Sequence, residues 1–208
     1  MTHSHLTLSP PSEWVKRWAH LIPGAKPNPA LDVVHPSPDE VSFGVVLDLA
    51  CGGGRHMKWL CEQGLKVLGV DKDALALEQC RAFGEVLIAD LETPDGRALW
   101  PLENRQFAGI VVTNYLWRPL FPFILGSLED NAVLIYETFA DGHQSFGRPS
   151  RPEFLLKQGE LLEICANLRI IAYEEVLLSN PDRFVQRIVA INGSGEVCAP
   201  HRYRSTSR

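Results

Sequence analysis

Three consecutive glycines directly after an apolar segment form the strongest candidate in the chain for a ligand-binding turn. The segment reads Val45-Val-Leu-Asp-Leu-Ala-Cys-Gly-Gly-Gly-Arg55, with glycine at positions 52 to 54. Glycine lets the backbone turn sharply and approach a ligand closely, and a helix that begins after the turn offers unpaired N–H groups. The pattern therefore predicts a strand, a tight turn and a helix around an electron-rich ligand.

Two aspartates near this turn indicate the class of ligand. Asp71 lies nineteen residues beyond Gly52, at the end of the next apolar segment, where a carboxylate can accept both hydrogen bonds of a ribose diol. Asp48 lies inside the first predicted strand, where a buried carboxylate needs a positive or hydrogen-bonding partner. Together these residues predict a site for a nucleoside-containing cofactor.

The dinucleotide-binding pattern G-x-G-x-x-G is incomplete in this chain. A pattern that began at Gly52 would need glycine at position 57, and the residue there is Met57. Since the third glycine allows close packing of helix and strand, a nicotinamide-dependent oxidoreductase is disfavoured, although it stays open as an alternative on the same fold. The glycines could also serve strand-to-helix packing alone.

The elements that would position these residues alternate along the chain. Five short, nearly charge-free segments predict strands of a parallel sheet that is buried on both faces. These segments are 45–49, 66–70, 86–89, 108–113 and 132–136. Helical patterns occur at 55–63, 73–83, 160–167 and directly after Pro119. The alternation predicts a doubly wound α/β fold.

The C-terminal third follows a different pattern. Residues 138–153 are rich in glycine, proline and polar residues and are long for a connection, so we expect an active-site loop there. Segments 169–176 and 184–191 flank the turn cluster Ser179-Asn-Pro-Asp182 and predict an antiparallel hairpin.

The predicted domain spans residues 43–192 and has a short extension at each end. Residues 1–42 combine an amphipathic helix over 11–21 with a proline-rich, extended connection. Trp14 and Trp18 share one face of that helix, which favours packing on the core over a lid on the ligand site. Residues 193–208 predict a tail with a basic end.

Composition excludes several classes of protein. The chain has 208 residues, 45% of them hydrophobic and 22% charged, with a formal net charge of −5, as expected for one globular domain. No apolar run approaches bilayer-spanning length and no signal-peptide pattern is present, so we expect a cytoplasmic protein. The negative charge disfavours a nucleic-acid partner.

Five scattered cysteines predict reduced thiols, with neither a disulfide framework nor a metal site. The oligomeric state stays open.

Taken in order, these motifs resemble those of the class I S-adenosylmethionine-dependent methyltransferases, over roughly residues 43–191. The first motif of that family, acid-x-Gly-x-Gly-x-Gly, is similar to Asp48-Leu-Ala-Cys-Gly-Gly-Gly54, with Ala50 in place of the first glycine. The resemblance implies S-adenosylmethionine as cofactor. It also implies a Rossmann-like, mostly parallel seven-stranded sheet with an antiparallel last strand.

The resemblance assigns cofactor-binding roles to individual residues. Asp71 would bind the ribose, Asp90 would accept from the exocyclic amine of adenine, and Asn114 would end the strand that faces the methyl group. The full cofactor-binding set is Asp48, Ala50, Cys51, Gly52, Gly54, Arg55, Asp71, Lys72, Asp90, Leu91 and Asn114.

Candidate catalytic residues lie where the fourth and fifth predicted strands end. Ligands bind at these carboxyl ends in open α/β sheets, and aromatic or acidic groups tolerate the positive charge of a sulfonium. The candidates are Asn114, Tyr115, Tyr136 and Glu137. His56, at the start of a predicted helix, could equally pack or contact a ligand.

A narrower resemblance concerns the acceptor of the methyl group. Segments 48–56 and 154–162 look like those of small bacterial methyltransferases related to tellurite-resistance proteins, which implies a small nucleophile. We therefore expect in-line methyl transfer to a small molecule, with RNA or protein acceptors and a non-catalytic cofactor-binding protein as alternatives. Arg148 and Arg151 of the predicted loop either select an anionic acceptor or are simply solvated.

Overall fold

The computed structural model describes residues 8–26 and 44–193 of the chain. Most of the predicted proline-rich connection lies outside these residues, and so does the predicted tail after residue 193.

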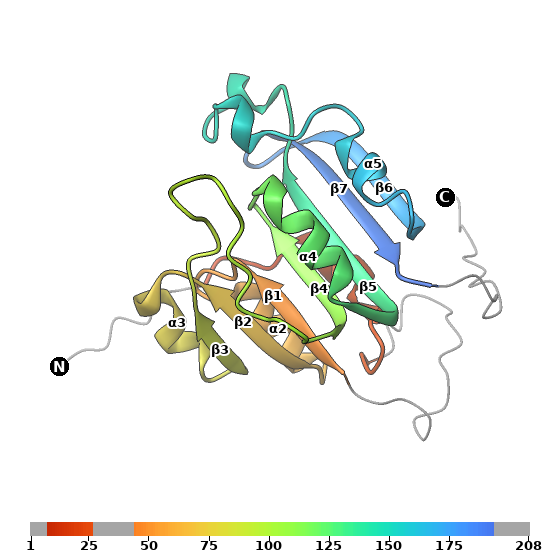
Figure 1. The fold of residues 1–208 in the computed structure, drawn as a ribbon. Coiled ribbons are helices and arrows are strands. Elements are labelled where there is room, and N and C mark those ends of the chain that lie inside the picture. The colour runs from red at the N-terminus through yellow and green to blue at the C-terminus, as the bar shows by residue number, and fades with distance from the viewer. Residues whose placement is uncertain (1–7, 27–43, 194–208) are drawn as a thin grey trace.

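One seven-stranded sheet runs through the described residues in the order β3-β2-β1-β4-β5-β7-β6 (Figure 1). The strands are β1 Val45–Leu49, β2 Lys66–Asp71, β3 Glu85–Ile88, β4 Phe107–Thr113, β5 Leu128–Phe139, β6 Arg169–Leu178 and β7 Arg183–Ile191. Strands β1 to β5 pair in parallel, whereas β7 is antiparallel to both β5 and β6. The predicted doubly wound, mostly parallel sheet with an antiparallel last strand is confirmed.

Helices cover both faces of this sheet. The helices α1 Glu13–Trp18, α2 Arg55–Glu62 and α3 Ala74–Cys80 pack into one apolar layer. The helices α4 Phe121–Gly126 and α5 Glu160–Ile164 pack into the other layer, in front of the sheet in Figure 1. Strand β4 shows why the sheet is double-sided, because Ile110 and Val112 contact the second layer and Val111 the first.

The N-terminal helix is shorter than the predicted range 11–21 and continues as a 3₁₀ turn over Ala19–Leu21. Ser12 caps it, because its Oγ accepts a hydrogen bond of 3.1 Å from the backbone N–H of Trp14. The Trp14 ring is 1% exposed, and its Nε1 donates to the carbonyl of Ile188 in β7 at 3.3 Å. The face of this helix that carries Trp14 and Trp18 therefore packs on the core, which is the alternative that the sequence favoured over a lid.

Strand β5 is longer at both ends than the predicted segment 132–136. At its start, Leu128 pairs with Phe107 before a shift in register, so the polar stretch 129–131 is included. At its end, Glu137, Thr138 and Phe139 pair with β7. The predicted loop 138–153 was therefore wrong at its start, since the antiparallel partner extends the strand and the loop begins at residue 140.

Candidate functional site

A cavity of about 600 Å³ opens at the carboxyl ends of β1 and β4. Its wall consists of the turn after β1, the start of α3, the end of β4 and the N-terminal residues Leu8 and Ser9. Among the predicted cofactor residues, those that line it are Ala50, Cys51, Gly52, Arg55 and Asn114. Volumes of this size are typical of small-molecule sites.

The turn between β1 and α2 uses left-handed backbone at alternating positions. Ala50, Gly52 and Gly54 have φ values of 55°, 54° and 79°. Ala50, at the position of the first glycine of the motif, thus adopts a left-handed conformation that glycine favours. Gly54 is the most constrained of the three, because a Cβ there would lie 2.6 Å from the Sγ of Cys80.

Asp71 fastens this turn to the end of β2. Its Oδ2 accepts from the backbone N–H of Gly52 at 2.8 Å, and its Oδ1 accepts from the N–H of Asp73 at 3.0 Å. A carboxylate has about four lone-pair sites, so both oxygens can accept further bonds from a ribose diol.

The carboxyl group of Asp48 is buried beside the turn. One of its oxygens has a backbone hydrogen bond with Met57, while Oδ2 has no hydrogen-bond partner among the described residues. Burial raises the pKa of Asp48 to about 7. A buried acceptor oxygen near the glycine turn fits a ligand with an ammonium group, which S-adenosylmethionine has.

His56 is held as a neutral imidazole at the cavity wall. Its Nε2 accepts a hydrogen bond of 3.0 Å from the N–H of Ser12, which leaves the proton on Nδ1, 3.4 Å from Thr113 Oγ1. Burial and the charge of Arg55 lower the pKa of His56 to about 3. His56 therefore connects the N-terminal segment to α2 and has no free basic nitrogen.

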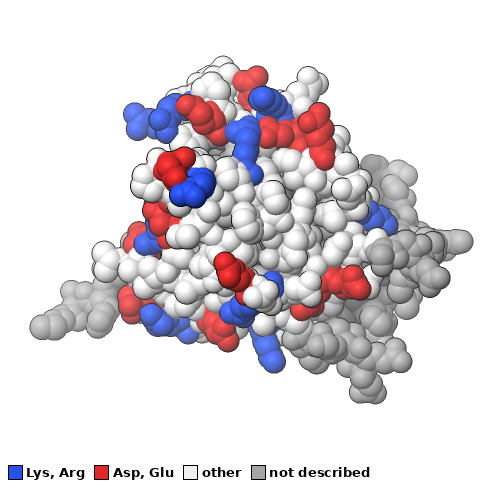
Figure 2. Space-filling model, in the orientation of Figure 1, with Lys and Arg blue, Asp and Glu red and all other residues white. Residues whose placement is uncertain are grey.

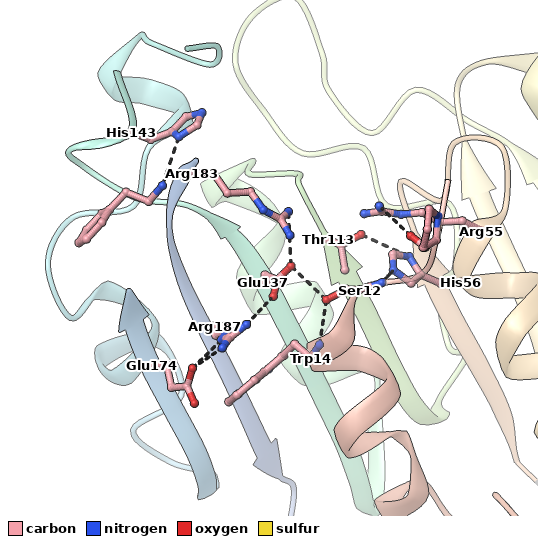
Figure 3. Close-up of polar contacts among 12 residues, drawn as sticks. Ser12, Trp14, Arg55, His56, Thr113, Glu137, His143, Glu174, Arg183 and Arg187 are labelled. Carbon is pink, nitrogen blue, oxygen red and sulfur yellow. Dashed lines mark hydrogen bonds and ion pairs between the residues drawn. The ribbon is translucent and has the colours of Figure 1, made fainter. Parts of the chain in front are cut away.

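Glu137 lies at the centre of a network of charges (Figure 3). Its Oε1 accepts from Ser12 Oγ at 3.1 Å and lies 3.8 Å from an Nη of Arg183. Its Oε2 lies 3.5 Å from an Nη of Arg187, whose guanidinium also bonds to Glu174 and stacks 4.6 Å above the Trp14 ring. Glu137 is 1% exposed, so it is a paired carboxylate and does not line the cavity.

The other predicted catalytic residues point in different directions. Asn114 lines the cavity and its N–H donates to the carbonyl of Glu137 at 2.9 Å. Tyr136 is in the α4 layer, where its hydroxyl donates to the carbonyl of Tyr115 at 2.8 Å. Burial and the nearby Glu92 raise the pKa of Tyr115, whose ring packs against the same core. Of these four residues, only Asn114 is on the cavity wall.

Three further predicted cofactor residues, Lys72, Asp90 and Leu91, lie apart from the cavity wall. Lys72 Nζ and Asp90 Oδ2 are 3.9 Å apart and both side chains are more than half exposed. Leu91 is 4% exposed and packs in the core. These residues belong to the neighbouring β2 and β3 end of the same sheet edge.

The loop after β5 is attached to its surroundings. Ala140 pairs with Leu156, and the buried His143 accepts from the N–H of Phe184 at 3.3 Å through Nδ1. Neither Arg148 nor Arg151, for which the sequence left an anion-selecting and a solvated role open, is on the cavity wall. Arg151 instead lies 4.5 Å above the ring of Phe154.

Sequence reasoning missed several residues at this edge. Gln79 Nε2 donates to the carbonyl of Gly53 at 3.1 Å and so covers the turn. Arg183 and Arg187 lie beside Glu137 because β7 is antiparallel, which brings its first residues to the carboxyl edge of the parallel strands. The predicted hairpin contained this signal, since its second strand had to begin at that edge.

Within residues 8–26 and 44–193, no group of three or more His, Cys, Asp or Glu side chains could hold a metal ion. Burial raises the pKa of the Cys51 thiol at the cavity wall, so it is protonated and unreactive. None of the described helices has the length and apolar character needed to cross a bilayer.

The chain is similar to known methyltransferases. Residues 46–126 match the family model described as "Methyltransferase domain". No curated protein gave a significant match. Among solved structures, TehB from Haemophilus influenzae is 17% identical with a TM-score of 0.56, and the match covers 73% of this chain and 58% of that one. A TehB-like methyltransferase from Corynebacterium glutamicum is 19% identical with a TM-score of 0.52, covering 72% and 80%.

A third similar structure comes from Mesorhizobium loti. This S-adenosylmethionine-dependent methyltransferase is 18% identical with a TM-score of 0.58, and the match covers 73% of this chain and 92% of that one. The matched model spans the turn after β1 and strands β1 to β4, and the strand order is that of the class I enzymes. Residues 46–126 therefore resemble a methyltransferase domain, and the described sheet has the fold of the class I S-adenosylmethionine-dependent methyltransferases, a family that implies S-adenosylmethionine as cofactor.

Proposed function

We propose that the protein transfers the methyl group of S-adenosylmethionine to a small-molecule acceptor by in-line displacement. The observation that carries this proposal is the cavity that joins the glycine turn to Asn114 at the end of β4. One volume thus connects a turn suited to the cofactor with the strand end at which the acceptor would meet the methyl group.

The residues around the turn fit the cofactor. Backbone N–H groups of the turn would contact its polar groups, Asp71 would bind the ribose, and Asp48 Oδ2 would face the ammonium. When bound, the cofactor supplies an electrophilic methyl group on a sulfonium, so the protein has to position and desolvate the acceptor.

Among the described residues, neither His56 nor Glu137 offers a free general base to an acceptor near Asn114. His56 Nε2 is occupied by the Ser12 N–H, and Glu137 is ion-paired on both of its oxygens. We therefore expect an acceptor atom that has an available lone pair at neutral pH without help from the protein.

Calorimetry with S-adenosylhomocysteine tests the cofactor site. We expect a micromolar Kd, roughly −8 kcal/mol, and no binding of a reduced nicotinamide dinucleotide. Ala76 lines the cavity on α3, whereas Glu78 on the same helix is exposed and outside it. Ala76→Phe should raise the Kd at least tenfold, and Glu78→Phe should leave it unchanged.

The ribose contact has a separate variant. Asp71→Ala should also raise the Kd at least tenfold, and circular dichroism should show that the variant is folded. Absence of S-adenosylhomocysteine binding to the wild type would contradict the proposed function. Binding that neither Ala76→Phe nor Asp71→Ala weakens would place the cofactor elsewhere.

A small molecule is favoured over a macromolecule as the acceptor. The net charge is −5, and on the face in Figure 2 acidic and basic side chains lie interspersed, without a broad basic surface. A panel of small thiols, amines, carboxylates and phenols, assayed with radiolabelled methyl donor, should contain a labelled product. Label found only in RNA or protein would contradict the small-molecule acceptor. We also expect the protein to act in the cytoplasm, without a nucleic-acid partner.

A further inference from the structure

Arg55, a predicted cofactor residue, and Arg183, which the cofactor motifs do not include, both lie beside the cavity (Figure 3). Arg55, the first residue of α2, lines the cavity and donates from Nη1 to the carbonyl of Pro10 at 3.3 Å. Arg183, the first residue of β7, reaches towards Glu137 from the far side of Thr113 (Figure 3). Both side chains therefore point into the region between the ends of β4 and β5.

The two guanidinium groups are close enough to repel each other. Burial lowers the pKa of Arg55 and the charge of Arg183 lowers it further, while the nearby carboxylates of Glu137 and Asp48 oppose this shift. Two like charges in a partly desolvated position are unfavourable unless a negative group lies between or beside them.

The arginines of this cluster outnumber its carboxylates. Three guanidiniums belong to Arg55, Arg183 and Arg187, and two carboxylates belong to Glu137 and Glu174. Arg187 uses both carboxylates, with its Nε 2.8 Å from Glu174 Oε2. Among the described residues, the ion-pair partner of Arg183 is Glu137 alone, which it shares with Arg187, at 3.8 Å, a distance longer than a hydrogen bond.

Asp48 offsets only part of the remaining charge. Its carboxyl is close enough to influence Arg55, but burial raises its pKa to about 7, so it is only partly ionised at neutral pH. Arg183 is 26% exposed on its side chain and keeps donors that a ligand in the adjoining space could use.

We infer that the methyl acceptor carries an oxyanion group, such as a carboxylate or a phosphate, and that Arg183 and Arg55 bind it. This inference rests on the proposed function and names the acceptor class. Guanidinium forks match the geometry of two-oxygen anions, and a bound anion would place its uncharged part towards Thr113 and Asn114. Arg183 acts as a specificity-determining residue, because it selects the acceptor without taking part in the displacement.

A titration with two probes of equal size tests this. Acetate and acetamide are added at constant ionic strength to protein saturated with S-adenosylhomocysteine, and arginine ¹⁵Nε–¹H resonances are followed. We expect acetate to shift the Arg183 and Arg55 resonances saturably and to bind at least fivefold more tightly than acetamide. Arg183→Gln should remove this preference, and Arg183→Lys should retain part of it, since lysine keeps the charge and loses the fork.

Arg105→Gln is the matched control. Arg105 lies near the start of β4, at the opposite edge of the sheet, where its guanidinium is 3.8 Å from Glu85. This variant should bind acetate as the wild type does. Equal affinity for the two probes, or an acetate preference that survives in Arg183→Gln, would overturn the inference.

The test separates this inference from the proposed function. Arg183→Gln should bind S-adenosylhomocysteine with the Kd of the wild type, because Arg183 is outside the turn that would hold the cofactor. Cofactor binding without an acetate preference refutes the anionic acceptor alone. Failure of the wild type to bind S-adenosylhomocysteine refutes the methyl-transfer proposal, and acetate binding can then still be measured on the protein without the ligand.

Discussion

Asp48 is placed where an ionised carboxylate is costly to the fold. It is 1% exposed within β1, and its Oδ2 has no hydrogen-bond partner among the residues of the described ranges. Such a group destabilises the folded protein when it is ionised, and under the proposed function it would face the ammonium group of the cofactor. Stability and ligand binding therefore make opposite demands on this residue.

The variant Asp48→Asn distinguishes the effect of this residue on stability from its effect on ligand binding, because only the ionised carboxylate makes stability depend on pH. The folded pKa of Asp48, about 7, is above the unfolded value of 3.8, so wild-type stability from this group is present below pH 4 and is lost as the pH rises through 7. Asp48→Asn lacks this loss. Urea unfolding should show the variant gaining on the wild type by on the order of 2–4 kcal/mol between pH 4 and pH 8, while its affinity for S-adenosylhomocysteine falls.

The contribution of His56 to stability also depends on pH. The wild type and Asp48→Asn are therefore compared through the difference between their free energies of unfolding at each pH. The lowered pKa of His56, about 3, gives the opposite slope, because the unfolded state takes up a proton below about pH 6.5 and the folded state does not. The contribution is the same in wild type and variant and cancels in the difference. A difference in unfolding free energy that is constant from pH 4 to pH 8 would contradict the role given to Asp48.

We expect Glu137 to contribute to the stability of the fold and not to the reaction directly. Glu137→Gln leaves the cluster of Arg183 and Arg187 short of a buried negative charge, so unfolding should require about 3 kcal/mol less. Glu13→Gln is the control, because Glu13 pairs with Lys16 at 2.7 Å on the surface and should contribute less than about 0.5 kcal/mol. Equal losses in the two variants, measured by denaturant unfolding, would show that burial adds nothing to the pair.

The signals for the predicted cofactor residues are local. Asp48 lies inside a strand that the apolar pattern marks, Gly52 follows that strand, and Asp71 ends the next one. Arg183 depends on a partner forty-six residues earlier in the chain, Glu137, and on the direction of β7. Tyr136 and Glu137 were predicted together, yet successive residues of a strand point to opposite faces, so they could not share one site.

The turn between β1 and α2 offers a test at the scale of an element. Gly54 and Gly96 both have a positive φ, but a Cβ at Gly54 meets Cys80 Sγ at 2.6 Å, whereas a Cβ at Gly96 meets nothing within 4 Å. Gly96→Ala should therefore lose about 1 kcal/mol of stability from backbone strain, and Gly54→Ala about 2–4 kcal/mol from strain and the contact together. Thermal or urea unfolding of the two variants compares them directly, and similar losses would mean that Cys80 moves aside.

Elements were predictable where their own residues are sufficient to specify them. The charge-free run of β4 is buried along its whole length, and the sequence predicted it within one residue. The ends of β5 were not predictable, because residues 129–131 and Glu137 are polar and belong to the strand only through pairing with β4 and β7. Hydrogen bonding to a partner strand overrides local preference there.

At the scale of the whole molecule, the N-terminal helix is part of the core. Trp14→Ala removes a ring that is 1% exposed and contacts β7, so we expect a loss of about 3–5 kcal/mol. Phe123→Ala, at a position 43% exposed on α4, should lose about 1 kcal/mol. Chemical denaturation measures both, and a small effect of Trp14→Ala would mean that the helix is dispensable for the fold.

The hydrogen bond between Ser12 and Glu137 joins residues 125 positions apart. The same carboxylate also pairs with Arg183. The charge network beside the cavity therefore contains residues from the start, the middle and the end of the described chain. Contacts of such long range make folding slow and cooperative, since their loop-closure entropy is lost before they stabilise anything. On the ribosome, the glycine turn would be synthesised long before the edge that selects the acceptor, so the two halves of the site mature at different times.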